Sequence, residues 1–238
     1  ATNIKYRANL LTGYFWVTKQ LSGKPESMRS KSGYHHGDLK EALINASRKI
    51  LSESGADALS LRAIAAEVGV SHMAPYSHFK NKKELFQVIA ASGFDELADQ
   101  MLENSQSIRK PSELILVYGT TYIEFAIQKP QLYRLMLGQV ENVGRRNQSS
   151  DTTKIDISLE QPIVSSELER SSKRPFDLLD KAFSQTSDNE LYVKAQALGA
   201  WSMVHGMAAL LIEGHFVIPA SMSIKEFLAM AAIQKTIK

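Results

Sequence analysis

The chain has 238 residues, 44% of them hydrophobic, and a formal net charge of +3 at pH 7. That is enough apolar material to bury one large core or two modest ones. The absence of cysteine excludes disulfides, thiolate catalysis and Cys-ligated metals, and suits a reducing cytoplasm. No window reaches the roughly 18 uninterrupted apolar residues of a membrane span, since His205, Glu213 and His215 break the richest stretch, so no membrane contact is expected.

Positive charge is concentrated near the start of the chain. Residues 28–84 hold nine Lys and Arg against six Asp and Glu, together with four of the six histidines. A basic, histidine-rich segment ahead of an acidic remainder favours an encounter with a polyanion. Ordinary scatter of charge explains the same counts, so charge alone does not decide the matter.

Residues 1–32 are expected to be an extension or arm without ordered structure. The run LLTGYFWV faintly resembles a signal peptide, but it is short and no clear small-residue cleavage site follows it. Met28 opens MRSKSGYHHGDL, a natural-looking start, so residues 1–27 need not belong to the native protein. Arg29 and Lys31 form either an arm that reaches phosphates or an untethered basic tail.

From Asp38 onward the apolar residues recur at helical spacing and show no strand alternation. The first helix is expected to end at Gly55, and the second to begin after the N-cap Ser60. Further helices are expected over 72–79, 82–107, 111–128, 130–137, 173–184, 189–213 and 224–237. The polar segment 139–169 is expected to be a mobile loop. The expected fold is all-α, with a small unit at 33–83 and a larger helical body at 84–238.

The segment LRAIAAEVGVSHMAPYSHFK, residues 61–80, has the spacing of a helix-turn-helix. Ala65 is small where the second helix crosses the first, and Gly69 permits a turn conformation that strains other residues. Pro75 predicts a short, tightly wound recognition helix that is held by packing through Pro75 and Phe79. The side chains expected to project outward suit base edges and phosphates; they are Ser71, His72, Met73, Tyr76 and Ser77.

The stretch 33–85, with GYHHGDLKEALINAS, LSLRAIAAEVGVS and APYSHFKNKKEL, resembles the DNA-binding domain of the TetR family of bacterial repressors. YRLML at 133–137 and WSMVHGMAALL at 201–211 are similar to the Trp-His-Gly type of ligand-binding domain in that family. The resemblance implies a homodimer that binds a near-palindromic operator in double-stranded DNA. It also implies that a small hydrophobic effector, whose identity the sequence leaves open, releases the protein from DNA.

The same resemblance implies roles for single residues near the turn. Arg62 would contact a phosphate or a base. Four residues would face the groove, namely Ser71, His72, Met73 and Ser77, and three would hold the DNA backbone, namely Tyr76, His78 and Lys82. Pro75 stands where many members have Leu, and Ser77 where larger side chains are common, so no base preference is transferred.

In the body, helices of this family enclose a small-molecule cavity, although most apolar residues on such helices are core. The residues that the resemblance marks as ligand-binding candidates are Tyr122, Phe125, Met136, Trp201 and His205. His205 is either a buried hydrogen-bonding group or a ligand contact. Glu213 and His215 are too few and too loosely spaced for a metal site. The last two expected helices would pair with their symmetry mates in a four-helix dimer interface.

The sequence therefore favours a ligand-responsive transcriptional regulator, most simply a repressor, with no cofactor and no catalytic residues. One alternative is a helical DNA-binding protein without a small-molecule effector. Another is an enzyme built on the ligand-binding body, but the chain lacks a nucleophile–base arrangement, a phosphate loop and metal-ligand spacing. Activation in place of repression remains open at this stage.

Overall fold

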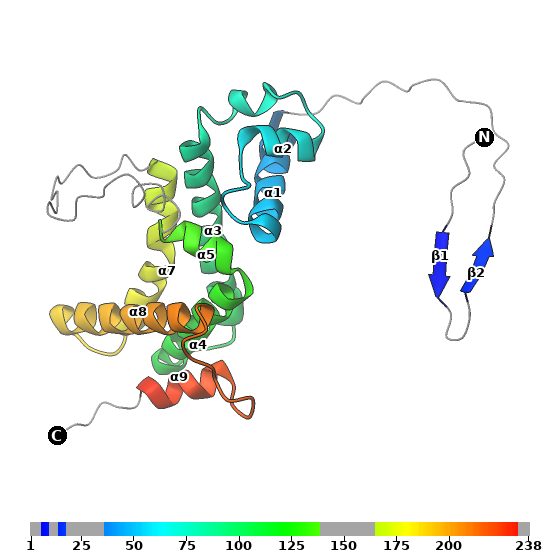
Figure 1. Ribbon diagram of the computed structural model, residues 1–238. Helices are drawn as coiled ribbons and strands as arrows, with labels where there is room; N and C mark the ends of the chain where they lie inside the picture. The colour runs from blue at the N-terminus through cyan, green and yellow to red at the C-terminus, as the bar shows by residue number, and fades with distance from the viewer. Residues whose placement is uncertain (1–5, 10–13, 18–35, 139–164, 233–238) are drawn as a thin grey trace, which may run out of the picture. The chain divides into compact units, whose positions relative to one another are not determined.

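The structure, a computed structural model, describes residues 6–9, 14–17, 36–138 and 165–232 (Figure 1). The chain divides into two units, residues 1–35 and residues 36–238. In the first unit, β1 (Tyr6–Asn9) pairs antiparallel with β2 (Tyr14–Val17), and Tyr6 lies opposite Val17. Aromatic and β-branched residues, as in YFWV, favour strands, and the expectation for residues 1–32 as a whole stays a prediction. Met28, Arg29 and Lys31 lie outside the described residues.

The described part of the second unit contains helices only, which confirms the all-α fold there. The elements are α1 (His36–Ser54), α2 (Leu61–Val68), the 3₁₀-helix η1 (Ala74–Ser77), α3 (Lys82–Asn104), α4 (Pro111–Gln128), α5 (Pro130–Met136), α7 (Ser166–Ser184), α8 (Glu190–Ile212) and α9 (Ile224–Ala232). Both α4 and α5 begin with proline, which has no N–H to lose at that position.

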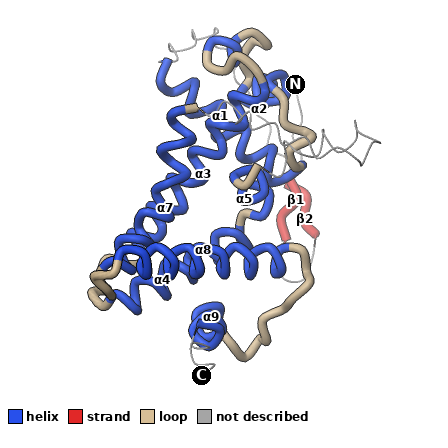
Figure 2. Tube along the Cα trace, turned by 90° about the vertical axis from the view of Figure 1, so that its left-hand side faces the viewer, coloured by secondary structure: helices blue, strands red, loops and turns tan. Residues whose placement is uncertain are grey.

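The helices α1, α2 and η1 lie together at one end of α3, and the other helices gather around the rest of it (Figure 1). The long helix α3 runs beside α7 and in contact with α4 and α5. The helix α8 crosses the direction of α3 and α7, and α9 lies below α4 and α8 in both views (Figure 2). One long helix thus belongs to both halves of this unit.

A continuous hydrophobic core explains this arrangement. It includes Leu43, Ile64 and Phe79 at the helix-turn-helix end and reaches Phe125 and Leu228 in the body. Its members along α3 recur from residue 85 to residue 101, so α3 is buried along most of its length. Because well-packed interiors deform little, α3 is a rigid link between the two ends.

Helix α7 begins seven residues earlier than expected, inside the segment assigned to a loop. The hydroxyl of Ser165 caps it by accepting a hydrogen bond from the N–H of Leu168 at 3.2 Å. Ser171, which is fully buried, donates to the Asp95 carboxylate at 2.9 Å. This inward position makes a polar contact, so apolar periodicity gave no sign of the first turns of α7. Residues 139–164 and 233–237 lie outside the described part of the chain.

Candidate functional site

The turn between α2 and η1 has the geometry that the sequence predicts. Gly69 has φ +75°, and its N–H donates to the Ala66 carbonyl at 3.2 Å. The N–H of Val70 donates to the Ala65 carbonyl at 2.9 Å, which closes the end of α2. Ala65 is fully buried. Packing therefore favours a small residue at position 65, and the left-handed backbone favours glycine at position 69.

The element that follows the turn is shorter than expected. In place of a helix over 72–79, the structure has a four-residue 3₁₀-helix, Ala74–Ser77, within a series of turns. Pro75 and Phe79 are fully buried, which confirms that they anchor this element. Pro75 lies in the first turn, where a missing N–H forfeits no helical hydrogen bond. Packing, and not helix propensity, holds the recognition element.

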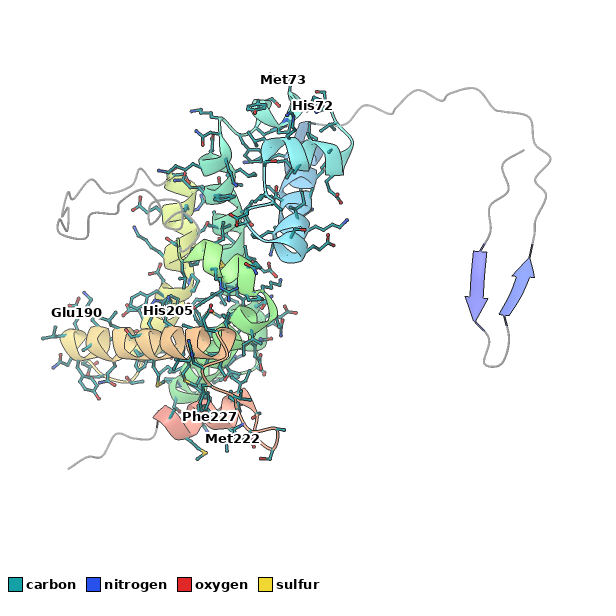
Figure 3. The ribbon with its side chains drawn as sticks, viewed as in Figure 1. His72, Met73, Glu190, His205, Met222 and Phe227 are labelled. Atoms are coloured by element: carbon teal, nitrogen blue, oxygen red, sulfur yellow. The ribbon has the colours of Figure 1, made fainter. Side chains whose placement is uncertain are left out.

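The opposite face of this element is open to solvent. Met73 is 72% exposed and Tyr76 52% exposed, and the side chains of Arg62, Ser71 and His72 are also exposed. Figure 3 shows His72 and Met73 at the end of the second unit that lies away from α8, where His205 is labelled. We call this set the η1 face: Arg62, Ser71, His72, Met73, Tyr76 and Ser77. It offers hydrogen-bonding groups and a cation where a large ligand has free access.

Two of the predicted DNA contacts, Ser77 and Lys82, already bind protein groups, and a third, His78, has a buried ring nitrogen. The hydroxyl of Ser77, which is exposed, donates to the Ala74 carbonyl at 2.7 Å. Nε2 of His78 is buried and has no hydrogen-bond partner among the described residues. Nζ of Lys82 donates to the Ala56 carbonyl at 3.3 Å and lies 5.1 Å from the centre of the Phe86 ring. Their roles toward DNA stay predictions.

A cavity of about 560 Å³ lies in the body between α4, α7, α8 and α9. Its wall is mainly apolar and aromatic, and among the described residues no Asp, Glu, Lys, Arg or His side chain lines it. The larger lining side chains are Ile115, Tyr118, Tyr122, Phe183, Trp201 and Met203. Such a wall binds apolar, uncharged groups, since a buried unpaired charge is strongly unfavourable.

The predicted ligand residues divide into two groups. Tyr122 and Trp201 line the cavity. Phe125 and Met136 are buried in the core and are absent from the described lining of the cavity, so their role toward a ligand stays a prediction. His205 also lies outside the wall. The contribution of α7, through Phe183, was not predicted, because only the tertiary structure shows which helix closes the cavity.

His205 belongs to a cluster of aromatic side chains beside the cavity. The Tyr122 hydroxyl lies 2.8 Å from Nδ1 of His205 and 3.2 Å from the Tyr133 hydroxyl. The ring of Trp201 is 5.0 Å from that of Tyr122 and 5.1 Å from that of His205. Figure 3 places His205 on α8, away from the η1 face.

Burial governs ionisation in this cluster. It raises the pKa of Tyr122, and the neighbouring Tyr133 raises it further. Burial also raises the pKa of Tyr133, against the effect of its hydrogen bond with Tyr122. Burial lowers the pKa of His205, against a hydrogen bond with the Trp201 backbone. All three groups are therefore neutral near pH 7, so the cluster supplies hydrogen bonds to the cavity wall without supplying charge.

Two family models match this chain. Residues 43–89 match the model described as bacterial regulatory proteins, tetR family, and residues 115–232 match a tetracyclin repressor-like C-terminal domain. The chain belongs to the TetR family. The first match contains the turn at Gly69 and the η1 face from Ser71 onward, and the second contains Tyr122 and Trp201 of the cavity wall.

One curated protein and several solved structures are also similar to this chain. An uncharacterized HTH-type transcriptional regulator, YobS of Bacillus subtilis (strain 168), is 26% identical over 106 residues, which are 44% of this chain and 55% of the relative. The chain thus spans about half the length of this curated relative. A protein of unknown function from Rhodococcus sp. RHA1 superposes with a TM-score of 0.64 at 24% identity, covering 85% of this chain and 95% of its own.

The transcriptional regulator FadR from Bacillus subtilis, solved in complex with stearoyl-CoA, superposes with a TM-score of 0.53. It is 12% identical to this TetR-family chain, and the superposition covers 81% of this chain and 94% of FadR. At these identities the two solved structures show that the fold is shared.

Proposed function

We propose that this TetR-family protein is a transcriptional repressor that binds double-stranded DNA through the η1 face and is released by a small molecule in the cavity. The observation that carries the proposal is the two-sided recognition element. Its inner side, Pro75 and Phe79, is fully buried, whereas its outer side exposes Met73 and Tyr76. A rigidly anchored element with polar groups on its free side suits the reading of base edges in a groove.

Within this proposal, the residues of the η1 face, together with the neighbouring His78 and Lys82, divide by the part of DNA that their chemistry suits. Ser71, His72, Met73 and Ser77 face the groove, and Arg62 contacts a phosphate or a base. Tyr76, His78 and Lys82 hold the sugar-phosphate backbone. Because the Ser77 hydroxyl already donates to a carbonyl, it acts toward DNA as a hydrogen-bond acceptor.

The effector that fits the cavity is uncharged and largely apolar. Tyr118 and Tyr122 are the aromatic lining residues that also carry a hydroxyl, and the part of the wall that the structure describes has no charged side chain to pair with an ionic head group. The stearoyl-CoA bound by FadR offers one type of group that fits such a wall, an acyl chain. Phosphate groups of a ligand like this would have to stay outside the cavity.

A second copy of the chain covers the outer side of α8 in this proposal. Leu191 is 80% exposed and Leu198 59% exposed, while Val193 and Ala197 of the same helix are buried. Among the described residues, α8 alone is long and apolar enough to cross a membrane, and 17% of its most apolar window is buried. A core helix of a soluble protein passes the same test when it is mostly buried, so the exposed apolar side of α8 needs a cover, which the second copy supplies in this proposal. Paired copies would place two η1 faces on half-sites about 34–36 Å apart.

The test begins with selection of fragments of the source genome that the purified protein retains at low salt. Retained duplexes are then titrated by fluorescence anisotropy with wild type and with a His72→Ala/Met73→Ala double variant. We expect wild type to bind a near-palindromic duplex and the double variant to lose its preference for that duplex. Equal retention of all fragments by both proteins, or of none, would contradict the proposal.

Effector control and dimerisation are tested separately on the same duplex. A panel of neutral apolar compounds and acyl-CoA esters is added to the complex, and release by at least one compound is expected. If no compound releases the DNA, the alternative without a small-molecule effector is favoured. Leu198→Asp should dissociate the dimer in sedimentation velocity, whereas Leu102→Asp, at a 44% exposed position of α3, should leave it intact. If wild type sediments as a monomer, the proposed dimer is wrong.

A further inference from the structure

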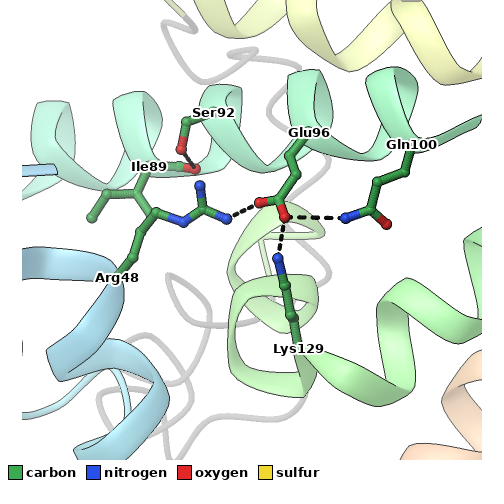
Figure 4. Close-up of polar contacts among 6 residues, drawn as sticks. All are labelled: Arg48, Ile89, Ser92, Glu96, Gln100 and Lys129. Carbon is green, nitrogen blue, oxygen red and sulfur yellow. Dashed lines mark hydrogen bonds and ion pairs between the residues drawn. The ribbon is translucent and has the colours of Figure 1, made fainter. Parts of the chain in front are cut away.

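The carboxylate of Glu96 on α3 joins three segments of the chain (Figure 4). It accepts from Arg48 on α1 through one oxygen and from Lys129 through the other. The amide of Gln100, one turn further along α3, donates to the same oxygen as Lys129 at 3.2 Å. We call Arg48, Glu96 and Lys129 the ionic junction.

One cation of the ionic junction belongs to the helix-turn-helix unit and the other to the helical body. Arg48 belongs to α1, which packs against α2 in the helix-turn-helix unit. Lys129 stands between the end of α4 and Pro130, the first residue of α5, and its N–H donates to the Phe125 carbonyl at 2.9 Å. Glu96 therefore ties the DNA-binding end to the corner between α4 and α5.

The ionic junction is charged at neutral pH and partly open to water. Burial alone would raise the pKa of Glu96, but hydrogen bonds from Lys129 and Arg48 outweigh burial and lower the pKa below its usual value. A cavity of about 620 Å³, lined also by Asn45 and Gln131, adjoins these three residues. Water and ions in that cavity screen the ion pairs, so their strength should depend on salt.

Helix α4 joins the corner that carries Lys129 to the ligand cavity. Helix α4 lines the cavity with Tyr118 and Tyr122, and Lys129 follows Tyr122 by about two helical turns. On the neighbouring side, a Cβ on Gly93 would lie 2.7 Å from Sδ of Met136, so α3 and α5 are in close contact. A shift of α4 therefore displaces Lys129 relative to Glu96 and to Arg48 on α1.

We propose that Glu96 is a positioning residue: it fixes the orientation of α1, and with it the η1 face, relative to α4 and α5. The expected consequence is that loosening the ionic junction weakens binding to the operator, and this consequence rests on the proposed function. The side chains of the ionic junction are 24–34% exposed, and salt bridges that water reaches contribute only modestly to stability. The effect of Glu96 should therefore appear in domain orientation and DNA affinity more than in unfolding.

The absence of cysteine gives a direct test, because spin labels can be attached at introduced cysteines without a background. Labels at Glu41→Cys on α1 and Glu113→Cys on α4, both exposed positions, report the distance between the two helices in the full-length protein. With Glu96→Gln or Glu96→Lys, we expect a broader or shifted distance distribution. Affinity for the selected duplex should fall by roughly tenfold, equivalent to about 1.4 kcal/mol.

Charge reversal separates pairing from loss of packing. Arg48→Glu/Glu96→Lys/Lys129→Glu restores opposite charges at all three positions and should restore both the distance distribution and the affinity. Glu169→Gln, which breaks the exposed Glu169–Lys173 pair (2.7 Å) within α7, is the matched control and should change neither. If Glu96→Gln does not fold, Lys129→Met removes one side of the junction and takes its place.

Two outcomes would overturn the inference: distances that stay unchanged in Glu96→Gln, or a charge-reversed triple variant no closer to wild type than Glu96→Lys. Its failure is distinct from failure of the proposed function. If wild type binds no duplex at all, the regulatory proposal is wrong, and the spin-label distances still decide whether Glu96 orients α1.

Discussion

The Tyr122 hydroxyl lies 2.8 Å from Nδ1 of His205, and this contact joins α4 to α8 beside the ligand cavity. Tyr122 has one side on the cavity and its hydroxyl on the cluster behind it. A ligand that presses on the ring of Tyr122 thus acts on α4 and on α8 at once. Both helices matter to the proposed mechanism, because α4 leads to Lys129 and α8 carries the proposed dimer surface.

Tyr122→Phe should destabilise the folded protein by about 1–3 kcal/mol, because it leaves the polar groups of His205 and Tyr133 with a missing partner in a buried place. Tyr133→Phe is the comparison, since it removes only the 3.2 Å contact with Tyr122, and should cost less. Urea unfolding at a fixed protein concentration measures both. A larger loss in Tyr133→Phe would show that Tyr133, and not Tyr122, is central to the cluster.

His205 should make stability fall as the solution becomes mildly acidic. Its pKa is lowered by burial in the folded state, so between that value and the ordinary pKa of about 6.5 the unfolded chain binds more protons. The free energy of unfolding therefore rises with pH through this interval. The stability linked to neutral His205 is fully present above pH 6.5, and it is lost as the pH falls from 6.5 toward the folded-state pKa of His205.

The comparison of wild type with His205→Gln checks this sign. We expect the unfolding midpoint of wild type to drop between about pH 7.5 and pH 5.5 more than that of the variant. The pKa of Glu96 is lowered, so that carboxylate costs stability only in more acidic solution. Parallel curves for the two proteins would mean that His205 is not protonated on unfolding in this range.

Gly69→Ala should destabilise the helix-turn-helix by about 1–2 kcal/mol through the backbone alone. The φ of Gly69 is +75°, and a Cβ there would meet no atom within 4 Å, so steric contact adds nothing. Gly69→Asn should cost less, since Asn tolerates the left-handed region better than Ala. Thermal unfolding of the two variants tests the order, and equal stability of Ala and Asn would contradict it.

Lys82→Ala and His72→Ala should affect DNA binding in different ways. If Lys82 contacts a phosphate, its loss weakens binding to all duplexes. The logarithm of the binding constant then falls less steeply with the logarithm of salt concentration, and the size of this negative slope decreases by about one. His72→Ala should change the preferred sequence more than it weakens nonspecific binding. Anisotropy titrations at several salt concentrations distinguish the two effects. An unchanged salt slope in Lys82→Ala would assign Lys82 to its bond with the Ala56 carbonyl.

Short-range sequence signals predicted where many of the helices begin and end. The caps of α2 and α3, Ser60 and Asn81, accept hydrogen bonds from N–H groups three residues on, as side chains at helix starts do. The glycines that end α1 and α2 have positive φ, and Pro111 and Pro130 begin helices at the predicted positions. All of these signals depend on neighbours within a few residues.

The sequence by itself determined most of the helices, the turn at Gly69 and the inward anchors Pro75 and Phe79, because backbone geometry and local spacing dictate them. The short 3₁₀-helix at Ala74–Ser77 and the early start of α7 appeared only in the structure. Only the tertiary structure decided that Phe183 borders the cavity while Phe125 and Met136 fill the core. It alone brought Arg48, Glu96 and Lys129 together. Contacts between distant segments depend on how helices cross, and crossing is set by the packing of whole faces, which no short stretch of sequence contains.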